Sequence, residues 1–272
     1  MDQSVPPAPE ILAHSLLAFW ADAGVDCLYQ DEAVDRIALG LSPPPRRVEL
    51  APTPLRTSGS PAGPAADAVA QARHLASQAH DLAALAEAIA SFEGCPLRYE
   101  GAATRSVFSR GPADAPVMII GEGPGGDEDA RGEPFVGRAG QLLDRMLAAA
   151  GLTDRVFMTN TVFWRPPGNR TPSAAEQAVC APFVERAITL VRPKMLLLVG
   201  GASAKTMLKR DEGILAMRGR WFEWRAEDES LELPAMPTLH PAFLLRQPAA
   251  KKKAWSDLVS LVQRLDRPER PH

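Results

Sequence analysis

An apolar run that ends abruptly in a glycine-rich turn constrains the fold of this chain more than any other feature. Residues 117–120 have strand character, and residues 121–125 read Gly-Glu-Gly-Pro-Gly. In the next long stretch, residues 137–150, apolar side chains recur at helical spacing. A strand, a loop and a helix in this order are typical of an open α/β sheet, which binds its ligand beyond the carboxyl end of the strand. Glycines in such a turn let the backbone approach a ligand closely.

The same alternation recurs along the chain. Further strand patterns cover residues 156–161, 195–200 and 235–239, and further helical patterns cover residues 65–92, 172–191, 202–209 and 248–265. This alternation predicts a three-layer α/β/α fold with a central, mostly parallel four-stranded sheet. Because Glu122, Asn160 and His240 each follow a strand, we expect a site where these strand ends meet.

The N-terminal part of the chain has a different composition. Residues 1–40 are predicted to form a helical segment, since apolar side chains within residues 8–23 follow one stripe. That stripe needs a partner surface, either on the main domain or on a separate protein. Residues 41–64 are rich in proline and predict a disordered linker, so the main domain is expected to span residues 65–272.

Composition limits where and how the protein works. No apolar run approaches the roughly 20 residues of a membrane span, and residues 1–10 lack the basic start of a secretory signal. The three cysteines, Cys27, Cys95 and Cys180, are widely separated and favour a reducing, cytoplasmic setting. A net charge of -3 neither predicts nor excludes nucleic-acid binding, because a local basic rim is enough to bind phosphates. We expect a monomer with no membrane partner.

Two of the polar positions have both a binding and a structural interpretation. The Asn160 amide offers a donor and an acceptor side by side, which complements an imide edge such as that of uracil, but a turn or capping asparagine fits equally. Residues 165–170 read Arg-Pro-Pro-Gly-Asn-Arg and form a rigid cationic loop. Arg165 and Arg170 would meet phosphates or an acidic neighbour there, unless the loop is simply solvated.

The segment that follows the last predicted strand has an unusual composition for an exposed loop. His240 precedes a proline, and Leu244, Leu245 and Arg246 come shortly after it. Two leucines could enter a DNA stack as a wedge while the arginine holds a phosphate, although a lone histidine is more often structural. Phe135 lies among small residues and fits either a flat face for a base or the core.

Five motifs together decide between these interpretations. In chain order they are Gly121-Glu122-Gly123-Pro124-Gly125, Gly132-x-Pro134-Phe135-Val136-Gly137-Arg138-Ala139-Gly140-Gln141-Leu142-Leu143-Asp144, Thr159-Asn160, Arg165-Pro166-Pro167-x-Asn169-Arg170 and His240-Pro241-Ala242-Phe243-Leu244-Leu245-Arg246. The chain resembles the family-4 uracil-DNA glycosylases in all five. The resemblance runs from about residue 92 to about residue 265 and implies a DNA glycosylase that hydrolyses the N-glycosidic bond of uracil to start base-excision repair.

The resemblance also implies roles for individual residues. Phe135 would stack on the flipped uracil, Asn160 would read its Watson–Crick edge, and His240 would favour departure of the base as an anion. Backbone N–H groups of Glu122 and Gly123 would help to bind the base. For the DNA strand, the implied contacts are Arg165, Arg170, Leu244, Leu245 and Arg246. Among the nearby carboxylates we rank Glu128 first as a catalytic contributor, with structural pairing as its alternative.

The chain departs from the family at its cofactor. Family-4 enzymes typically hold a 4Fe-4S cluster on four cysteines, of which Cys95 and Cys180 match two. Phe92 and Trp164 stand at the other two positions and cannot bind iron. We therefore expect the cluster to be lost, with no other metal or cofactor in its place.

A second class of function remains open from the sequence. A non-catalytic module that binds uracil or abasic DNA and recruits repair partners would suit the N-terminal segment and linker. Retention of Phe135, Asn160 and His240 together favours the enzyme, since a binding module need not keep all three.

Overall fold

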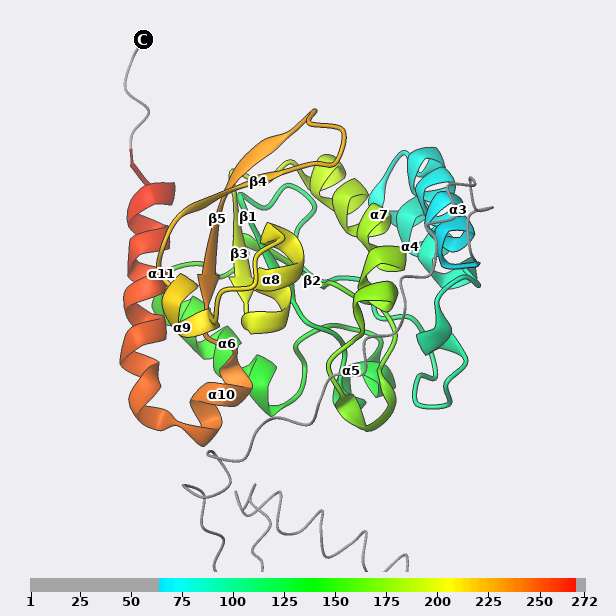
Figure 1. Ribbon diagram of the computed structural model, residues 1–272. Coiled ribbons are helices and arrows are strands. Elements are labelled where there is room, and N and C mark those ends of the chain that lie inside the picture. Colours follow the sequence, from blue (N-terminus) through cyan, green and yellow to red (C-terminus); the bar gives the residue numbers. More distant parts are fainter. Residues whose placement is uncertain (1–63, 268–272) are drawn as a thin grey trace, which may run out of the picture. The chain divides into compact units, whose positions relative to one another are not determined.

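A twisted five-stranded sheet forms the centre of the protein (Figure 1). The computed structural model describes residues 64–267. In the order of the sheet, the strands are β2 (Val156–Asn160), β1 (Val117–Gly121), β3 (Met195–Val199), β5 (Glu232–Thr238) and β4 (Phe222–Arg225). The first four of these run parallel, and β4 pairs with β5 in the antiparallel direction. The segments predicted for residues 1–40 and 41–64 lie outside the described residues, apart from Pro64.

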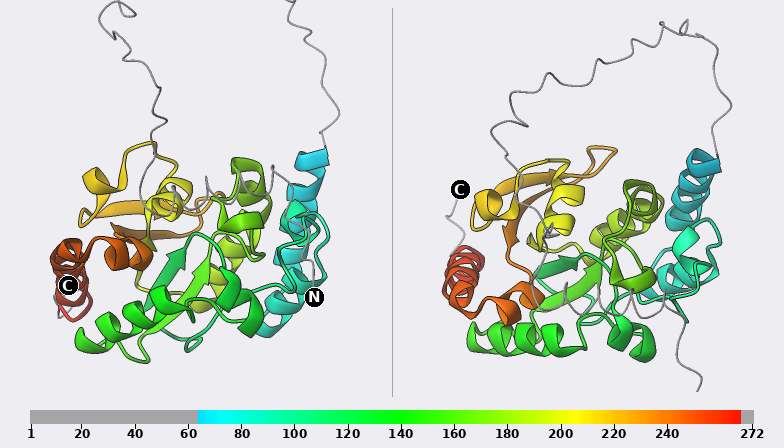
Figure 2. Two further views of the ribbon diagram at one scale, coloured as in Figure 1. Left: turned by 90° about the horizontal axis from the view of Figure 1, so that it is seen from below. Right: turned by 60° about the horizontal axis from the view of Figure 1, so that its bottom comes forward.

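Helices connect the strands and cover both faces of the sheet (Figure 2). The α-helices are α3 (Pro64–Gln78), α4 (Leu82–Ser91), α5 (Gly126–Arg131), α6 (Arg138–Ala149), α7 (Ala174–Val191), α8 (Gly201–Leu208), α9 (Ile214–Met217), α10 (Pro241–Arg246) and α11 (Lys251–Leu265). Short 3-10 turns occur at η1 (Pro96–Arg98), η2 (Pro167–Asn169) and η3 (Pro248–Ala250). Within residues 64–267, no helix has both the length and the apolar character that crossing a membrane requires.

Alternate residues of each central strand supply two separate cores. Met118 and Ile120 of β1 belong to a cluster that includes side chains of α3, α4 and α7. Val117 and Ile119 belong to a second cluster with side chains of α6 and α11. Because successive side chains of a strand point to opposite faces, a strand buried on both sides must be apolar throughout. These two cores confirm the predicted three-layer α/β/α fold.

The strand count predicted from the sequence is wrong by one. The missing strand is β4, whose sequence Phe222-Glu223-Trp224-Arg225 alternates between apolar and charged residues. Only Trp224 of this strand is buried, as expected for an edge strand with one face in solvent. The four strands found from the sequence are buried on both faces, over the whole of β1, β2 and β3 and over residues 235–238 of β5.

The helix predicted over residues 65–92 is divided in two by a capping residue. Asp81 has an extended backbone, and its side chain accepts a hydrogen bond of 2.7 Å from the N–H of Ala84. An aspartate that caps a new helix in this way ends the preceding helical path. Both α3 and α4 pack against α7, on the side of the sheet away from α11 (Figure 1).

A buried ion pair joins the C-terminal helices to the sheet. The carboxylate of Asp257 on α11 accepts a hydrogen bond of 2.8 Å from Thr238 at the end of β5, and it forms an ion pair with Arg218. Burial raises the pKa of Asp257, whereas the bonds from Thr238 and Arg218 act in the opposite direction. Arg218 also donates to the carbonyl of Lys253, so it connects α9 to α11.

Replacement of Arg218 by methionine should destabilise the fold by about 3 kcal/mol, because it leaves the buried Asp257 carboxylate without its cation. Arg220→Met is the matched control, since the ion pair of Arg220 with Glu212 is exposed and should contribute at most about 1 kcal/mol. Urea unfolding of the two variants measures the difference. Equal midpoints would show that the Arg218 pair does not stabilise the fold.

Candidate functional site

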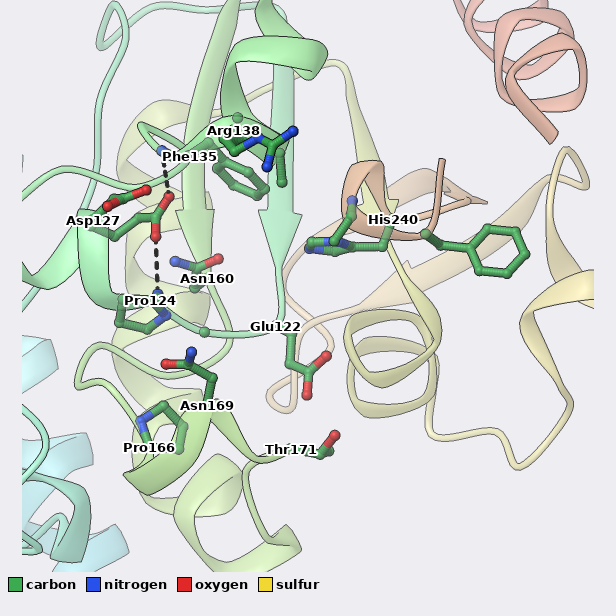
Figure 3. Close-up of a pocket in the computed structure, with 18 of the residues that line it drawn as sticks. Glu122, Pro124, Asp127, Phe135, Arg138, Asn160, Pro166, Asn169, Thr171 and His240 are labelled. Atoms are coloured by element: carbon green, nitrogen blue, oxygen red, sulfur yellow. Dashed lines mark hydrogen bonds between the residues drawn. The ribbon is translucent and has the colours of Figure 1, made fainter. Parts of the chain in front are cut away.

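The carboxyl ends of three parallel strands meet at one edge of the sheet and enclose a cavity of about 570 Å³ (Figure 3). The chain passes from β1 to β2 on one side and then crosses back from β2 to β3 on the other side of β1, so the strand order reverses at this point. Open α/β sheets form their binding crevice at such a position. The lining includes Glu122, Gly123, Asp127, Glu128, Phe135, Arg138, Asn160, Arg170, His240, Phe243 and Arg246.

Asn160 is the last residue of β2 and lies deep in this cavity. It is 2% exposed, yet its side chain makes no hydrogen bond with any other residue of the described part of the chain. Asn160 pairs in register with Gly121, and a Cβ at Gly121 would lie 2.4 Å from the Asn160 Oδ1 and 2.5 Å from the Phe135 Cζ. The absence of a side chain at position 121 therefore leaves room for the Asn160 amide and the Phe135 ring, which both line the cavity (Figure 3).

Phe135 reaches the cavity from a strained loop. Its φ of 58° lies in the left-handed region, which costs a non-glycine residue about 1–3 kcal/mol. Its carbonyl oxygen occupies the place of a side chain at Gly140, where a Cβ would come within 1.7 Å of the oxygen. The small residues around Phe135 in the sequence therefore serve close backbone packing.

Glu128 joins the glycine-rich turn to the Phe135 loop. Its carboxylate accepts hydrogen bonds from the N–H groups of Gly125 at 3.1 Å, Val136 at 3.0 Å and Gly137 at 2.9 Å. These bonds give Glu128 a positioning role, and its catalytic role stays a prediction. Glu122 and Asp127 also line the cavity, and their carboxylates make no side-chain hydrogen bond within the described residues.

His240 faces this group from the end of β5. It caps the N-terminus of α10, and its Nδ1 accepts a hydrogen bond of 3.1 Å from the N–H of Ala242. This bond fixes the tautomer that carries its proton on Nε2. Burial lowers the pKa of His240 to about 4, with the charge of Arg246 acting in the same direction and that of Glu128 in the other. The imidazole is therefore neutral near pH 7.

The two arginines of the cationic loop have different surroundings. Arg170 pairs with Glu176 at 2.6 Å and with Glu100 at 3.0 Å, and these carboxylates raise its pKa. It thus has the acidic neighbours that the sequence left as one interpretation. Arg165 donates to the Asn169 Oδ1 at 2.8 Å and has no carboxylate partner among the described residues.

The two predicted wedge leucines also differ. Leu245 is 38% exposed, whereas Leu244 is completely buried in a cluster with Leu142, Leu239 and Ala254. Leu244 cannot reach DNA without leaving the core, so the geometry favours Leu245 alone as the wedge. The reason is helical: residues 241–246 form α10, in which neighbouring side chains point in different directions. Arg246 is exposed at the end of this helix.

Comparison with known proteins identifies the family. The sequence profile described as "Uracil DNA glycosylase superfamily" matches residues 108–259 of the chain. The chain belongs to this superfamily. It is 38% identical to the type-4 uracil-DNA glycosylase of Pyrobaculum aerophilum over 171 residues, which cover 61% of this chain and 85% of that protein. It is 35% identical to the type-4 uracil-DNA glycosylase of Sulfurisphaera tokodaii, in a match that covers 61% of this chain and 78% of that protein. It is 36% identical to the type-4 enzyme of Thermotoga maritima, in a match that covers 56% of this chain and 77% of that protein.

The cluster typical of family-4 uracil-DNA glycosylases does not fit the residues present. Cys95 and Cys180 lie with their sulfurs 4.0 Å apart, and both are buried. Phe92 and Trp164 belong to the same core cluster, and the Phe92 ring also packs edge-on against Phe183 at 5.2 Å. A cubane needs four ligands, but the whole chain contains three cysteines. Residues 64–267 contain no group of three or more His, Cys, Asp or Glu side chains that could hold a metal ion.

Several positions that shape this cavity were not found from the sequence. Thr161 donates its hydroxyl to the carbonyl of Glu122 at 2.6 Å, which ties the glycine-rich turn to the end of β2. Gly200 has a φ of 98° and lies against the His240 ring, so that a Cβ added at Gly200 would be 3.2 Å from the His240 Cδ2. A glycine directly after an apolar strand is a usable signal for Gly200, whereas nothing local distinguishes Thr161 from a surface threonine.

The imidazole of His240 should titrate with a midpoint near pH 4, and nitrogen-detected NMR should find the proton of the neutral ring on Nε2. Because the folded-state pKa lies below the ordinary 6.5, the unfolded chain takes up the proton first as the pH falls. The contribution of His240 should therefore lower the free energy of unfolding progressively as the pH falls from about 6.5 to about 4. A midpoint near 6.5 would contradict the burial of this ring.

Proposed function

We propose that this protein hydrolyses the N-glycosidic bond of uracil in DNA and so begins base-excision repair. The observation that supports this most directly is the convergence of Phe135, Asn160 and His240 on one cavity. The similarity of the amino-acid sequence to proteins named type-4 uracil-DNA glycosylases supports the same activity.

Recognition begins with a base that leaves the DNA stack. Flipping costs a few kcal/mol, and least for a mispaired base, so the cavity must offset that cost with stacking and hydrogen bonds. The ring of Phe135 supplies a flat face, and the unpaired amide of Asn160 supplies an acceptor for uracil N3–H and a donor for O4. Cytosine presents the opposite pattern at this edge, so a fixed amide discriminates against it.

Bond cleavage then depends on the departing base. As the glycosidic bond breaks, the sugar gains oxocarbenium character and uracil gains negative charge. The neutral imidazole of His240 donates its Nε2–H to uracil O2, which stabilises the anion without transfer of the proton. Because the donor is already in place, no reorganisation is needed when the charge develops. Glu122, Asp127 and Glu128 are the carboxylates available to orient the attacking water.

DNA contacts surround the cavity. Arg165 and Arg246 are suited to phosphates, and the exposed Leu245 is suited to fill the space that the flipped base leaves. Arg170 would bind a phosphate only together with the carboxylates that already hold it. We also propose that the protein acts as a monomer in the cytoplasm; the spacing and odd number of its cysteines support the cytoplasmic setting.

Excision should be tested with a labelled oligonucleotide that contains one uracil, treated with alkali after incubation. The protein should yield strand scission, and His240→Ala and Asn160→Ala should each slow it by about a hundredfold or more, as expected when a fixed donor is removed. If DNA with uracil or an abasic site binds tightly but is never cut, the protein is a binding and recruiting module. Near-normal activity of either variant would remove that residue from the site.

A pair of glycine variants tests the shape of the cavity in the same assay. Gly121→Ala places a methyl group against Asn160 and Phe135, and it should abolish most excision while the protein remains folded. Gly213→Ala is the matched control, because a Cβ at that position would meet nothing within 4 Å. Equal activity of the two variants would argue against this cavity as the uracil site.

We further propose that the protein functions without a 4Fe-4S cluster. The paired thiols of Cys95 and Cys180 would then be packing residues, and the aromatic side chains of Phe92 and Trp164 would fill the space of the missing ligands. Edge-to-face aromatic pairs add about 0.5–1.5 kcal/mol each beyond the area they bury. The contacts of Phe92 with Phe183 and of Phe163 with Trp164 are of this kind.

Protein purified without oxygen should be colourless and free of iron, and reconstitution with iron and sulfide should not change this. The double variant Phe92→Cys/Trp164→Cys restores four thiol positions and serves as the positive control for reconstitution. Brown wild-type protein with about four irons per chain, the content of one cubane, would overturn the proposal.

A further inference from the structure

The position of the Phe135 ring depends on a backbone conformation that Phe135 does not favour. Its φ of 58° is left-handed, and a bulky side chain is rarely found there. Glu128 holds the two residues that follow, through the N–H groups of Val136 and Gly137. The carbonyl groups of this loop need a separate partner.

Arg110 provides that partner. Its Nε donates to the carbonyl of Pro134 at 2.8 Å, and its Nη2 donates to the carbonyl of Phe135 at 3.1 Å. The same Nη2 forms an ion pair of 2.6 Å with Asp144 on α6. One guanidinium therefore fixes the carbonyl groups on both sides of the Phe135 Cα and connects them to the helix that follows the loop.

The backbone of Arg110 is itself fixed to the sheet. Arg110 and Met158 form an isolated antiparallel bridge, with N–H to carbonyl bonds of 3.1 Å and 2.8 Å. Met158 lies on β2, two residues before Asn160. The group that holds the aromatic ring and the amide that faces it are thus positioned from the same strand.

We propose that Arg110 is a positioning residue for base recognition, which holds the ring of Phe135 parallel to the flipped uracil. The inference rests on the proposed function of the cavity. Arginine suits this role because its planar fork donates in several fixed directions, whereas a lysine ammonium acts as a point charge. The side chain of Arg110 is 25% exposed and lies outside the cavity lining, so it acts through Phe135 and not on the substrate.

The test compares Arg110→Met, Arg110→Lys and a matched control, Arg155→Met. Arg155 also pairs with an aspartate, Asp266 at 2.5 Å, but it does not contact the Phe135 loop. Three quantities separate positioning from general stability: inhibition of excision by free uracil, the single-turnover rate, and affinity for a duplex that carries an abasic-site analogue. The analogue offers no base to stack.

Arg110→Met should weaken inhibition by uracil and slow the single turnover by about ten- to a hundredfold, as expected for a misplaced binding group. Arg110→Lys should have a uracil inhibition and a single-turnover rate between those of Arg110→Met and the wild type. Affinity for the abasic analogue should not change in any variant. The proposal would be overturned if Arg110→Met lost affinity for the abasic analogue as strongly as it lost inhibition by uracil. It would also be overturned if free uracil inhibited Arg110→Met as strongly as it inhibits Arg155→Met.

Hydrogen exchange keeps this proposal separable from the proposed function. The amides of Val136 and Gly137 should exchange faster in Arg110→Met than in Arg155→Met, whether or not the wild type excises uracil. If the wild type neither cuts uracil-containing DNA nor responds to free uracil, the proposed function fails, and exchange alone decides whether Arg110 holds the loop. Unchanged exchange would reject that role as well.

Discussion

The parallel register between β1 and β2 is the constraint on which the rest of the site depends. Gly121 lies opposite Asn160, at the point where both strands end. A shift of one residue would turn the Asn160 side chain to the other face of the sheet and place a different side chain beside Phe135. The continuous apolar runs of both strands are buried on both faces, and the Thr161 hydroxyl bond to the turn after β1 adds a local tie. The core thus determines the geometry of the cavity.

Two groups in the cavity are held in defined states by their surroundings. Burial keeps His240 neutral, and the backbone of Phe135 keeps a strained conformation. Strain of this kind persists only where the surroundings determine the conformation several times over. Hydrogen bonds of its loop with Glu128 and Arg110, and the absence of a side chain at Gly140, fix the conformation of Phe135. The hydrogen bond from the Ala242 N–H and the close approach of Gly200 fix the ring of His240. In a preorganised site of this type the groups are ordered when the protein folds, so ligand binding loses little conformational entropy.

The sequence predicted the strands that are buried on both faces, and it missed β4, where only one face is buried. It also brought Phe135, Asn160 and His240 together, because ordered motifs and strand ends carry that information. It could not separate Leu244 from Leu245, since their difference arises from the short helix α10. Nor could it find Arg110, whose partners are two backbone carbonyls and Asp144 and lie 24 to 34 residues away in the chain. Contacts made by the backbone of a distant loop leave no pattern around the donor.

The aromatic cluster around Cys95 and Cys180 has a consequence for how the chain reaches its folded state. A domain organised by a metal cluster can complete its folding only after delivery of iron and sulfide, because the metal supplies part of the folding free energy. In this chain the corresponding region contains Phe92, Phe163, Trp164 and Phe183, whose packing needs only the polypeptide. On the proposal that the cluster is absent, newly made protein matures at the rate of its own folding. Its folding then needs no supply of iron.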